Sequence, residues 1–297
     1  MFFRHAENEP ELGLEVERLE NHFVPGDVVF ATITLTTKKA VEGAKLIAGL
    51  HIHSRHQAAH KTGHKDDDKA VSHKWVSKDD WIGKHELVAG VDLPRGLTNK
   101  YHLSWHIPED AAPSYNGEII QHTYKVTVTL DRSDGKDLKE EKEILVVKPA
   151  PGKKMQPGTY GEAKNAADAK MQFNLPKLEF VEGEVVTGKV FVEPHVDIEG
   201  TGIHLELWRV EKVREGDAEN VKEHRTESHG VTGIIRLGKG ESQTHDFSFP
   251  LKLQGCPTFK HGKVEGAWRF KAVINRPLAQ NCEVEQEVDL YAAYRQG

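Results

Sequence analysis

The sequence predicts an all-β protein built from two tandem immunoglobulin-like antiparallel β-sandwiches, with very little helix. Three observations lead to this fold class. Apolar and polar residues alternate along most of the chain, and a period of two is that of a half-buried strand. Clusters of Gly, Pro, Asn and Asp separate the alternating segments and are typical of turns. The third observation is a set of motifs that occurs twice in the same order.

The repeated motifs indicate a duplicated domain. Residues 23–29 read Phe-Val-Pro-Gly-Asp-Val-Val, and residues 180–186, which lie 157 positions later, read Phe-Val-Glu-Gly-Glu-Val-Val. A second pair of similar segments, 93–117 and 237–262, follows at an offset of 144 residues. A chain of 297 residues is long enough for two domains that each bury a core.

The domain boundaries follow from composition. We expect an N-terminal β-sandwich over residues 1–148 and a C-terminal one over 171–297. Residues 149–170 form the predicted linker, since Pro and Gly are concentrated in 149–161. Its second part, Glu162 to Lys170, is rich in Ala and could form one or two helical turns.

Each predicted strand is justified by its own alternation. In Val28 to Thr36, the side chains of Val29, Ala31, Ile33 and Leu35 share one face, and threonines occupy the other. In His122 to Leu130, Tyr124, Val126, Val128 and Leu130 share a face in the same way. The other predicted strands are rich in β-branched and aromatic residues, which pack well on a pleated surface. They are 46–55, 144–147, 184–192, 203–210, 244–249, 268–274 and 284–291.

Composition excludes several classes of protein. The net charge is −6 with acids and bases interspersed, which argues against a nucleic-acid partner. No run of eighteen apolar residues exists, so no membrane span is expected. The N-terminus turns acidic too early for a secretory signal. Cys256 and Cys282 could pair, but two free thiols in a reducing compartment are favoured, and we expect a cytoplasmic protein.

Histidine is the most unusual residue type in the chain. Six of the eighteen fall between His51 and His73. Because His51 and His53 are two apart on a predicted strand, both should point to one outward face, where they could hold a metal ion with His56 or Asp66–Asp68. The simpler interpretation is a solvated face that runs into a polar, mobile loop over residues 56–72. Protonation of these imidazoles could also sense mild acidification.

No catalytic motif is present. The sequence lacks Gly-x-Ser-x-Gly, a phosphate-binding loop, His-Glu-x-x-His and Cys-x-x-Cys. Cys256 lacks a recognisable histidine partner for a nucleophilic role. We therefore expect no enzyme activity, no cofactor and no small-molecule substrate.

Several motifs resemble the arrestin-fold proteins. The Pro-Gly-Asp strand opening at 25–27 and the segment from Leu93 to Leu130 carry the resemblance. That segment contains Ile107-Pro108, Pro113-Ser114-x-x-Gly117 and Tyr124-x-Val126, and it is similar to a segment of the α-arrestins. The second half repeats a degenerate version. Most of these residues are predicted to be structural: Trp105 and Tyr124 as core aromatics, and Ser114 as the partner of a local backbone group.

The resemblance implies an adaptor that binds protein partners in trafficking or signalling, with peripheral membrane association as a further possibility. The branch of the family, α-arrestin, bacterial sporulation-control or retromer-subunit type, is left open, and the Pro-Pro-x-Tyr motif is missing. Lys38, Lys39 and Arg55 are candidate partner contacts. The alternative function is a metal- or ligand-binding β-sandwich protein that uses the His51–His73 segment.

Overall fold

The computed structural model describes residues 9–17, 22–62, 70–150, 157–164 and 167–293. It is all-β, as the alternation predicts. The chain divides into two compact units, which are described separately. The first comprises 1–55, 76–115 and 121–147, and the second comprises 56–75, 116–120 and 148–297. Within the described ranges, no helix is long and apolar enough to cross a membrane.

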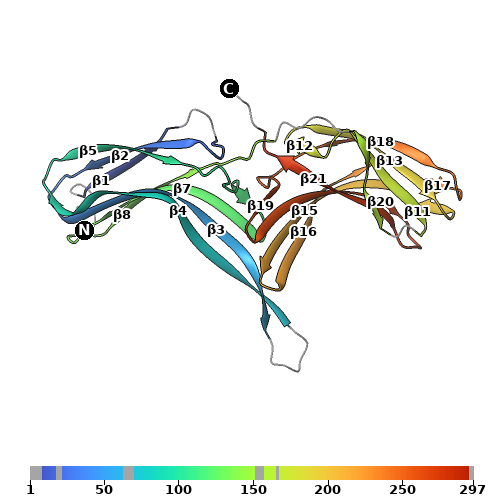
Figure 1. The fold of residues 1–297 in the computed structure, drawn as a ribbon, viewed down its shortest axis with the longest axis horizontal. Coiled ribbons are helices and arrows are strands. Elements are labelled where there is room, and N and C mark those ends of the chain that lie inside the picture. Colours follow the sequence, from blue (N-terminus) through green and yellow to red (C-terminus); the bar gives the residue numbers. More distant parts are fainter. Residues whose placement is uncertain (1–8, 18–21, 63–69, 151–156, 165–166, 294–297) are drawn as a thin grey trace, which may run out of the picture. The chain divides into compact units, whose positions relative to one another are not determined.

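The first unit is formed mainly by two antiparallel sheets (Figure 1). One has the order β1 (Glu11–Val16), β2 (Val28–Thr36), β5 (Thr98–His106). The other has the order β4 (Ala70–Leu93), β3 (Val41–Thr62), β7 (Ile120–Asp131), β6 (Tyr115–Asn116), and β8 (Leu138–Ile144) also pairs with β7. Parts of β3, β4, β6 and β7 belong to the second unit.

The core of the first unit lies between these sheets. Val29, Ala31, Ile33 and Leu35 of β2 are buried in one cluster with Tyr124, Val126, Val128 and Leu130 of β7. The two faces predicted from alternation are therefore confirmed. Trp105 of β5 is also buried, as predicted.

The second unit also contains two facing sheets and a short additional one. The larger sheet has the order β10 (Glu162–Lys164), β21 (Cys282–Tyr291), β20 (Val264–Asn275), β15 (Gly202–Glu215), β16 (Ala218–Gly230), with β12 (Glu179–Val181) on β21 and β19 (Phe259–His261) on β20. The smaller has the order β18 (Gln243–Pro250), β13 (Val185–Pro194), β11 (Ala169–Leu175), β9 (Gly158–Tyr160). Strands β14 (Ile198–Gly200) and β17 (Ile235–Leu237) form a pair.

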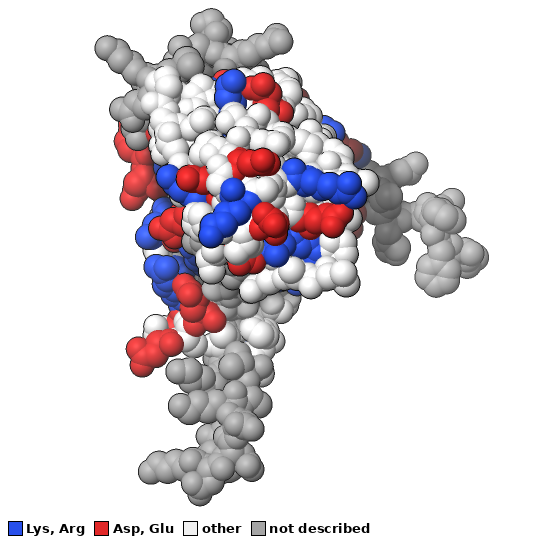
Figure 2. All heavy atoms as spheres, turned by 90° about the vertical axis from the view of Figure 1, so that its right-hand side faces the viewer, with Lys and Arg blue, Asp and Glu red and all other residues white. Residues whose placement is uncertain are grey.

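Aromatic side chains join the two sheets of this unit. Phe249 of β18 and Phe270 of β20 meet edge to face with ring centroids 5.7 Å apart, and both are fully buried. Over the end of the unit that includes β17, Lys and Arg side chains lie beside Asp and Glu side chains (Figure 2). Mixed charge of this kind agrees with the interspersed acids and bases of the sequence.

The repeated strand opening folds in the same way in both units. Asp27 accepts a hydrogen bond from the N–H of Val24 at 2.8 Å, and Glu184 accepts one from the N–H of Val181 at 3.0 Å. The intervening Gly26 and Gly183 have φ values of 95° and 86°, which only glycine adopts readily. A carboxylate and a glycine at these positions thus close the same turn before β2 and before β13.

Four expectations are wrong. Residues 56–62 and 70–72, predicted as loop, are strand, because β3 and β4 form a long hairpin. Residues 158–160 and 162–164 of the predicted linker form strands β9 and β10. Over Glu162–Lys164, a strand that pairs with β21 thus stands where helical turns are expected. Ser114 Oγ accepts from the N–H of Val146, thirty-two residues away, so its partner is not local. The fourth concerns His51 and is described below.

Candidate functional site

The predicted histidine pair lies on the outer face of β3. His53 Nδ1 is 2.6 Å from Asp79 Oδ1 on β4, and His51 Nδ1 is 3.6 Å from the same oxygen. Both rings therefore point to one face, as the alternation predicts. Asp79 was not foreseen as their shared partner, because the sequence does not give the register between β3 and β4.

His51 is buried, which corrects the expectation of an outward, solvated side chain. Its ring stacks on Trp81 with centroids 4.5 Å apart and planes inclined by 17°. Its Nε2 lies 3.0 Å from Thr127 Oγ1 on β7. The side chain is 6% exposed because neighbours on both adjacent strands cover it, although it faces away from the sandwich core.

These contacts shift the pKa values of His51 and Asp79. Burial lowers the pKa of His51 below its ordinary value, and the nearby Asp79 opposes this shift without reversing it. The hydrogen bond from His53 lowers the pKa of the Asp79 carboxyl. At neutral pH, the arrangement thus favours a neutral His51 beside an ionised Asp79.

His56 is not part of this group. Its Nε2 lies 3.9 Å from Glu215 in the second unit. Within the described ranges, no three His, Cys, Asp or Glu side chains are arranged to hold a metal ion. Asp66, Asp67 and Asp68 lie outside the described residues, so the metal site over His51, His53 and His56 stays a prediction.

The predicted partner-binding residues of the first unit are in contact with other groups of the protein. Lys38 donates a hydrogen bond to Glu11, and Lys39 forms an ion pair of 3.4 Å with Asp134. Arg55 also interacts with neighbouring groups. Pairs between side chains as exposed as those of Lys38 and Glu11 contribute little to stability, so they can exchange for a partner's carboxylate.

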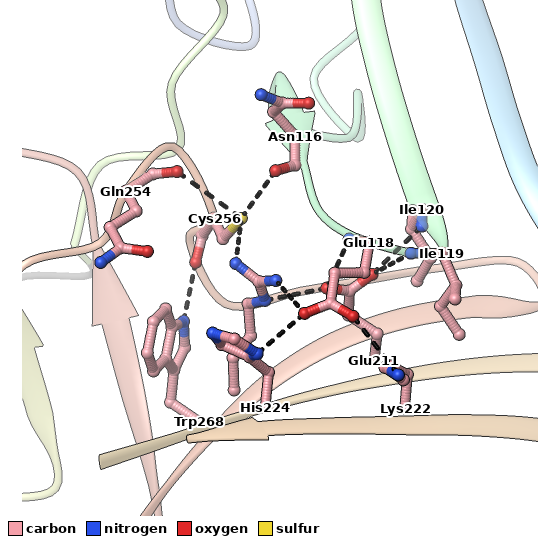
Figure 3. Close-up of polar contacts among 11 residues, drawn as sticks. Asn116, Glu118, Ile119, Ile120, Glu211, Lys222, His224, Gln254, Cys256 and Trp268 are labelled. Carbon is pink, nitrogen blue, oxygen red and sulfur yellow. Dashed lines mark hydrogen bonds and ion pairs between the residues drawn. The ribbon is translucent and has the colours of Figure 1, made fainter. Parts of the chain in front are cut away.

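The second unit contains a buried charged cluster that the sequence did not predict. Glu211 of β15 is 1% exposed. Its carboxylate accepts hydrogen bonds from the backbone N–H groups of Glu118, Ile119 and Ile120 at 3.0, 2.8 and 3.1 Å (Figure 3). Residues 116–120 belong to the second unit, whereas the chain before and after them belongs to the first. Glu211 thus fixes this segment to β15.

Arg209 neutralises the buried carboxylate. Its Nε lies 2.8 Å from Glu211 Oε1, and its Nη1 donates to Cys256 Sγ at 3.3 Å. Glu118 adds a second carboxylate, 3.5 Å from Arg209 Nη2 and 2.9 Å from His224 Nδ1 (Figure 3). Lys222 Nζ lies 3.5 Å from Glu118 Oε2. A buried carboxylate is stable only with partners of this kind, so the cluster holds the segment in one arrangement.

The thiol of Cys256 belongs to the same cluster. It donates to the carbonyl of Asn116 at 3.3 Å and is fully buried. Neither Cys256 nor Cys282 forms a disulfide, as favoured from the sequence. Cys256 serves here as a packed polar group that anchors residue 116.

One comparison with known proteins finds a family model that matches part of the chain. Residues 13–151 match the model of the arrestin (or S-antigen) N-terminal domain. The matched residues make up slightly less than half of the chain and include the whole of the motif-rich segment from Leu93 to Leu130. Among curated proteins, no sequence matches the chain.

Proposed function

We propose that this protein, which has an arrestin-like fold with an arrestin N-terminal domain over residues 13–151, is a non-enzymatic adaptor that binds partner proteins. The match to the arrestin N-terminal domain is the observation that carries the proposal. Proteins of this fold generally act by binding, through the faces, edges and loops of their sheets. The proposed setting is trafficking or signalling in the cytoplasm.

The sheets supply surfaces suited to this role. In the described structure, β5 ends the three-stranded sheet of the first unit, and β18 ends the corresponding four-stranded sheet of the second. An edge strand offers backbone N–H and C=O groups to an extended segment of a partner. Such binding needs no catalytic group.

Lys38, Lys39 and Arg55 are proposed as contacts in the first unit. Lys38 and Lys39 connect β2 to β3, and their side chains are 36% and 40% exposed. A partner with acidic side chains could replace Glu11 and Asp134 as their counterions. The double variant Lys38→Glu/Lys39→Glu should then capture less partner than the wild type. Lys189→Glu, which alters an exposed ion pair in the second unit, is the matched control.

Affinity capture from native lysate tests the adaptor function. The full-length protein is used as bait, and captured proteins are identified by mass spectrometry. We expect specific partners that the Lys38→Glu/Lys39→Glu variant recovers in lower yield. Recovery of no partner, together with turnover of a small substrate, would exclude the proposal.

The second candidate function is metal binding at His51 and His53, favoured by their shared approach to Asp79. Since His56 contacts Glu215 instead, a third ligand would have to come from Asp66–Asp68. Calorimetric titration with Zn²⁺ and Cu²⁺ tests it. Affinity that is lost in the His51→Ala/His53→Ala variant supports a site, whereas binding no tighter than that of a hexahistidine tag excludes one.

A further inference from the structure

The free edge of β5 in the first unit carries a row of exposed polar and basic side chains. The side chains of Thr98, Lys100, His102, Ser104 and His106 alternate along the strand, and all five residues are exposed. In the described structure, β5 pairs with β2 on one side and ends the sheet on the other. These five residues therefore form an accessible row beside an open edge.

The backbone groups of the same residues point to that open edge. Leu97 O accepts from the N–H of Thr37, and the N–H of Ile107 donates to Asp27 O. Pairing in an antiparallel ladder alternates, so the odd-numbered residues from 97 to 107 bond towards β2. Lys100, His102, Ser104 and His106 consequently present both their side chains and their backbone N–H and C=O groups to a ligand.

The charge of this row has one sign. Lys100 is basic, His102 and His106 supply imidazole N–H donors, and β5 contains no acidic residue. Arg95, exposed in the turn before the strand, adds a second full positive charge. On β2, the residues opposite Thr98, Lys100 and His102 are the uncharged Thr36, Thr34 and Thr32, and those opposite Ser104 and His106 are Phe30 and Val28. The acidic Glu11 and Glu15 lie on β1, with β2 between them and β5. An acidic ligand therefore meets no like charge on β5 or β2.

The duplicated strand in the second unit shows that this row is not required by the fold. β18 pairs with β13 as β5 pairs with β2, so Ser248 corresponds to Ser104. Asp246 stands at the position of His102, and it forms an ion pair with Lys189 at 3.1 Å. Pro250 stands at the position of His106 and lacks the N–H that a partner strand would use. β18 therefore lacks the basic, unblocked edge that β5 has.

We propose that the open edge of β5 binds an extended acidic segment of a partner protein by strand addition. This rests on the proposed adaptor function and names the chemistry of its partner. The segment contributes backbone hydrogen bonds to the even-numbered residues of β5, and acidic side chains at every second position meet Lys100, His102 and His106. A second copy of this chain is a poorer occupant, because pairing two β5 edges would bring their basic side chains together.

A peptide-binding experiment tests the proposal. The probe is a fluorescein-labelled peptide of sequence Thr-Glu-Val-Glu-Thr-Glu-Val-Glu, titrated with full-length protein and followed by fluorescence anisotropy. Matched peptides carry Gln or Lys in place of Glu. We expect the Glu peptide to bind at least about tenfold more tightly than the Lys peptide and to weaken as salt is raised. Equal binding of the three peptides would overturn the proposal.

Two proline variants separate edge pairing from charge. Ser104→Pro removes an N–H that points to the open edge, so it should leave the pairing with β2 intact and weaken the Glu peptide about tenfold. Ser248→Pro makes the same change on β18 and should leave binding unchanged. A Lys100→Gln/His102→Gln variant should weaken binding and reduce its salt dependence. Circular dichroism verifies that each variant is folded, and unchanged affinity in folded Ser104→Pro would contradict strand addition.

The same variant distinguishes this inference from the adaptor function. If wild type and Ser104→Pro capture the same partners from lysate in the same yield, the adaptor function stands and the β5 site is excluded. If partner yield falls with Ser104→Pro and not with Ser248→Pro, both are supported. If neither protein captures a partner, the adaptor function fails, and the peptide titration alone decides whether β5 binds acidic segments.

Discussion

Tyr124 and Trp268 make the same hydrogen bond from equivalent positions in the two units. Tyr124 Oη donates to the carbonyl of Ala112 at 2.6 Å, and Trp268 Nε1 donates to the carbonyl of Cys256 at 2.7 Å. Each ring is 1% exposed, and each acceptor lies twelve residues before its donor. The duplication has therefore kept a buried aromatic donor and not a particular side chain, because either ring fills the core while satisfying a buried carbonyl.

Replacement of Tyr124 by Phe should measure this bond. The ring volume is kept, but the carbonyl of Ala112 loses its donor in a buried place, so the free energy of unfolding should fall by about 1–3 kcal/mol. Tyr101→Phe, at a partly exposed ring of β5, is the control and should change it by less than about 0.5 kcal/mol. Urea denaturation of both variants provides the comparison. Equal stability of the two would show that the bond contributes nothing.

The turn that opens β2 and β13 gives a matched pair of glycine substitutions. Gly26 and Gly183 both have positive φ, so Ala at either position should cost about 1 kcal/mol or more in backbone strain. A Cβ on Gly26 would also lie 2.9 Å from the Glu109 carboxylate oxygens, whereas one on Gly183 meets open space. That carboxylate is the far end of an exposed side chain and can move aside, so the two substitutions should lower the midpoint of thermal unfolding by similar amounts. A much larger loss for Gly26→Ala would show that Glu109 is held in place.

The fold class was predictable because the sequence patterns that indicate it involve residues close together in the chain. The alternation in β2 and β7 gives the buried faces directly, and Asp27 and Glu184 close turns with partners three residues away. Patterns of this kind need only the strand period and turn chemistry. They give the fold class and the duplication without knowledge of any long-range contact.

The charged cluster and the burial of His51 could not be predicted, because both depend on contacts between residues far apart in the chain. Glu211 binds backbone groups that lie about ninety residues earlier in the chain, and an acid in an alternating segment resembles a solvent-facing position. His51 lies on the outer face, where its parity places it, but Trp81 and Thr127 cover it from neighbouring strands. The polar composition of residues 56–62 also concealed a strand, because pairing in a long hairpin needs no apolar face.

Glu211→Gln tests whether the buried cluster fixes residues 116–120. The glutamine amide has about the same size but no charge, so the buried Arg209 loses its nearer counterion and keeps only Glu118, 3.5 Å away. Loss of one partner of a buried ion pair typically costs about 3–5 kcal/mol. Glu199→Gln, in the exposed pair with Arg236, is the control and should cost less than about 1 kcal/mol.

Hydrogen exchange shows whether the loss of stability in Glu211→Gln comes from release of residues 116–120 or from another part of the protein. In Glu211→Gln, the amides of Glu118, Ile119 and Ile120 should exchange faster than in the wild type, since their acceptor is weakened. Unchanged exchange at these three amides, with a loss of stability elsewhere, would show that Glu211 does not hold the segment.

His51 should make the first unit less stable in mild acid. Burial holds its pKa in the folded protein below the ordinary value of 6.5, despite the opposing charges of Asp79 and Glu141, and Lys125 and Lys139 add to the lowering. The unfolded chain therefore binds the proton more readily, so this contribution to stability is present above pH 6.5 and is lost as the pH falls below it. The window of Asp79 is separate, because its pKa is lowered from 3.8 and its contribution is lost only in stronger acid.

The test is the slope of unfolding free energy against pH between about 6.5 and 5, measured by urea denaturation. His51→Gln should flatten this slope even though it also lowers stability at neutral pH. His53→Gln, at a more exposed ring on the same face, is the matched control and should leave more of the slope. His56 and His245, whose pKa values are also lowered by burial, supply the slope that persists in both variants. If His51→Gln kept the full slope, protonation of His51 would not be coupled to folding.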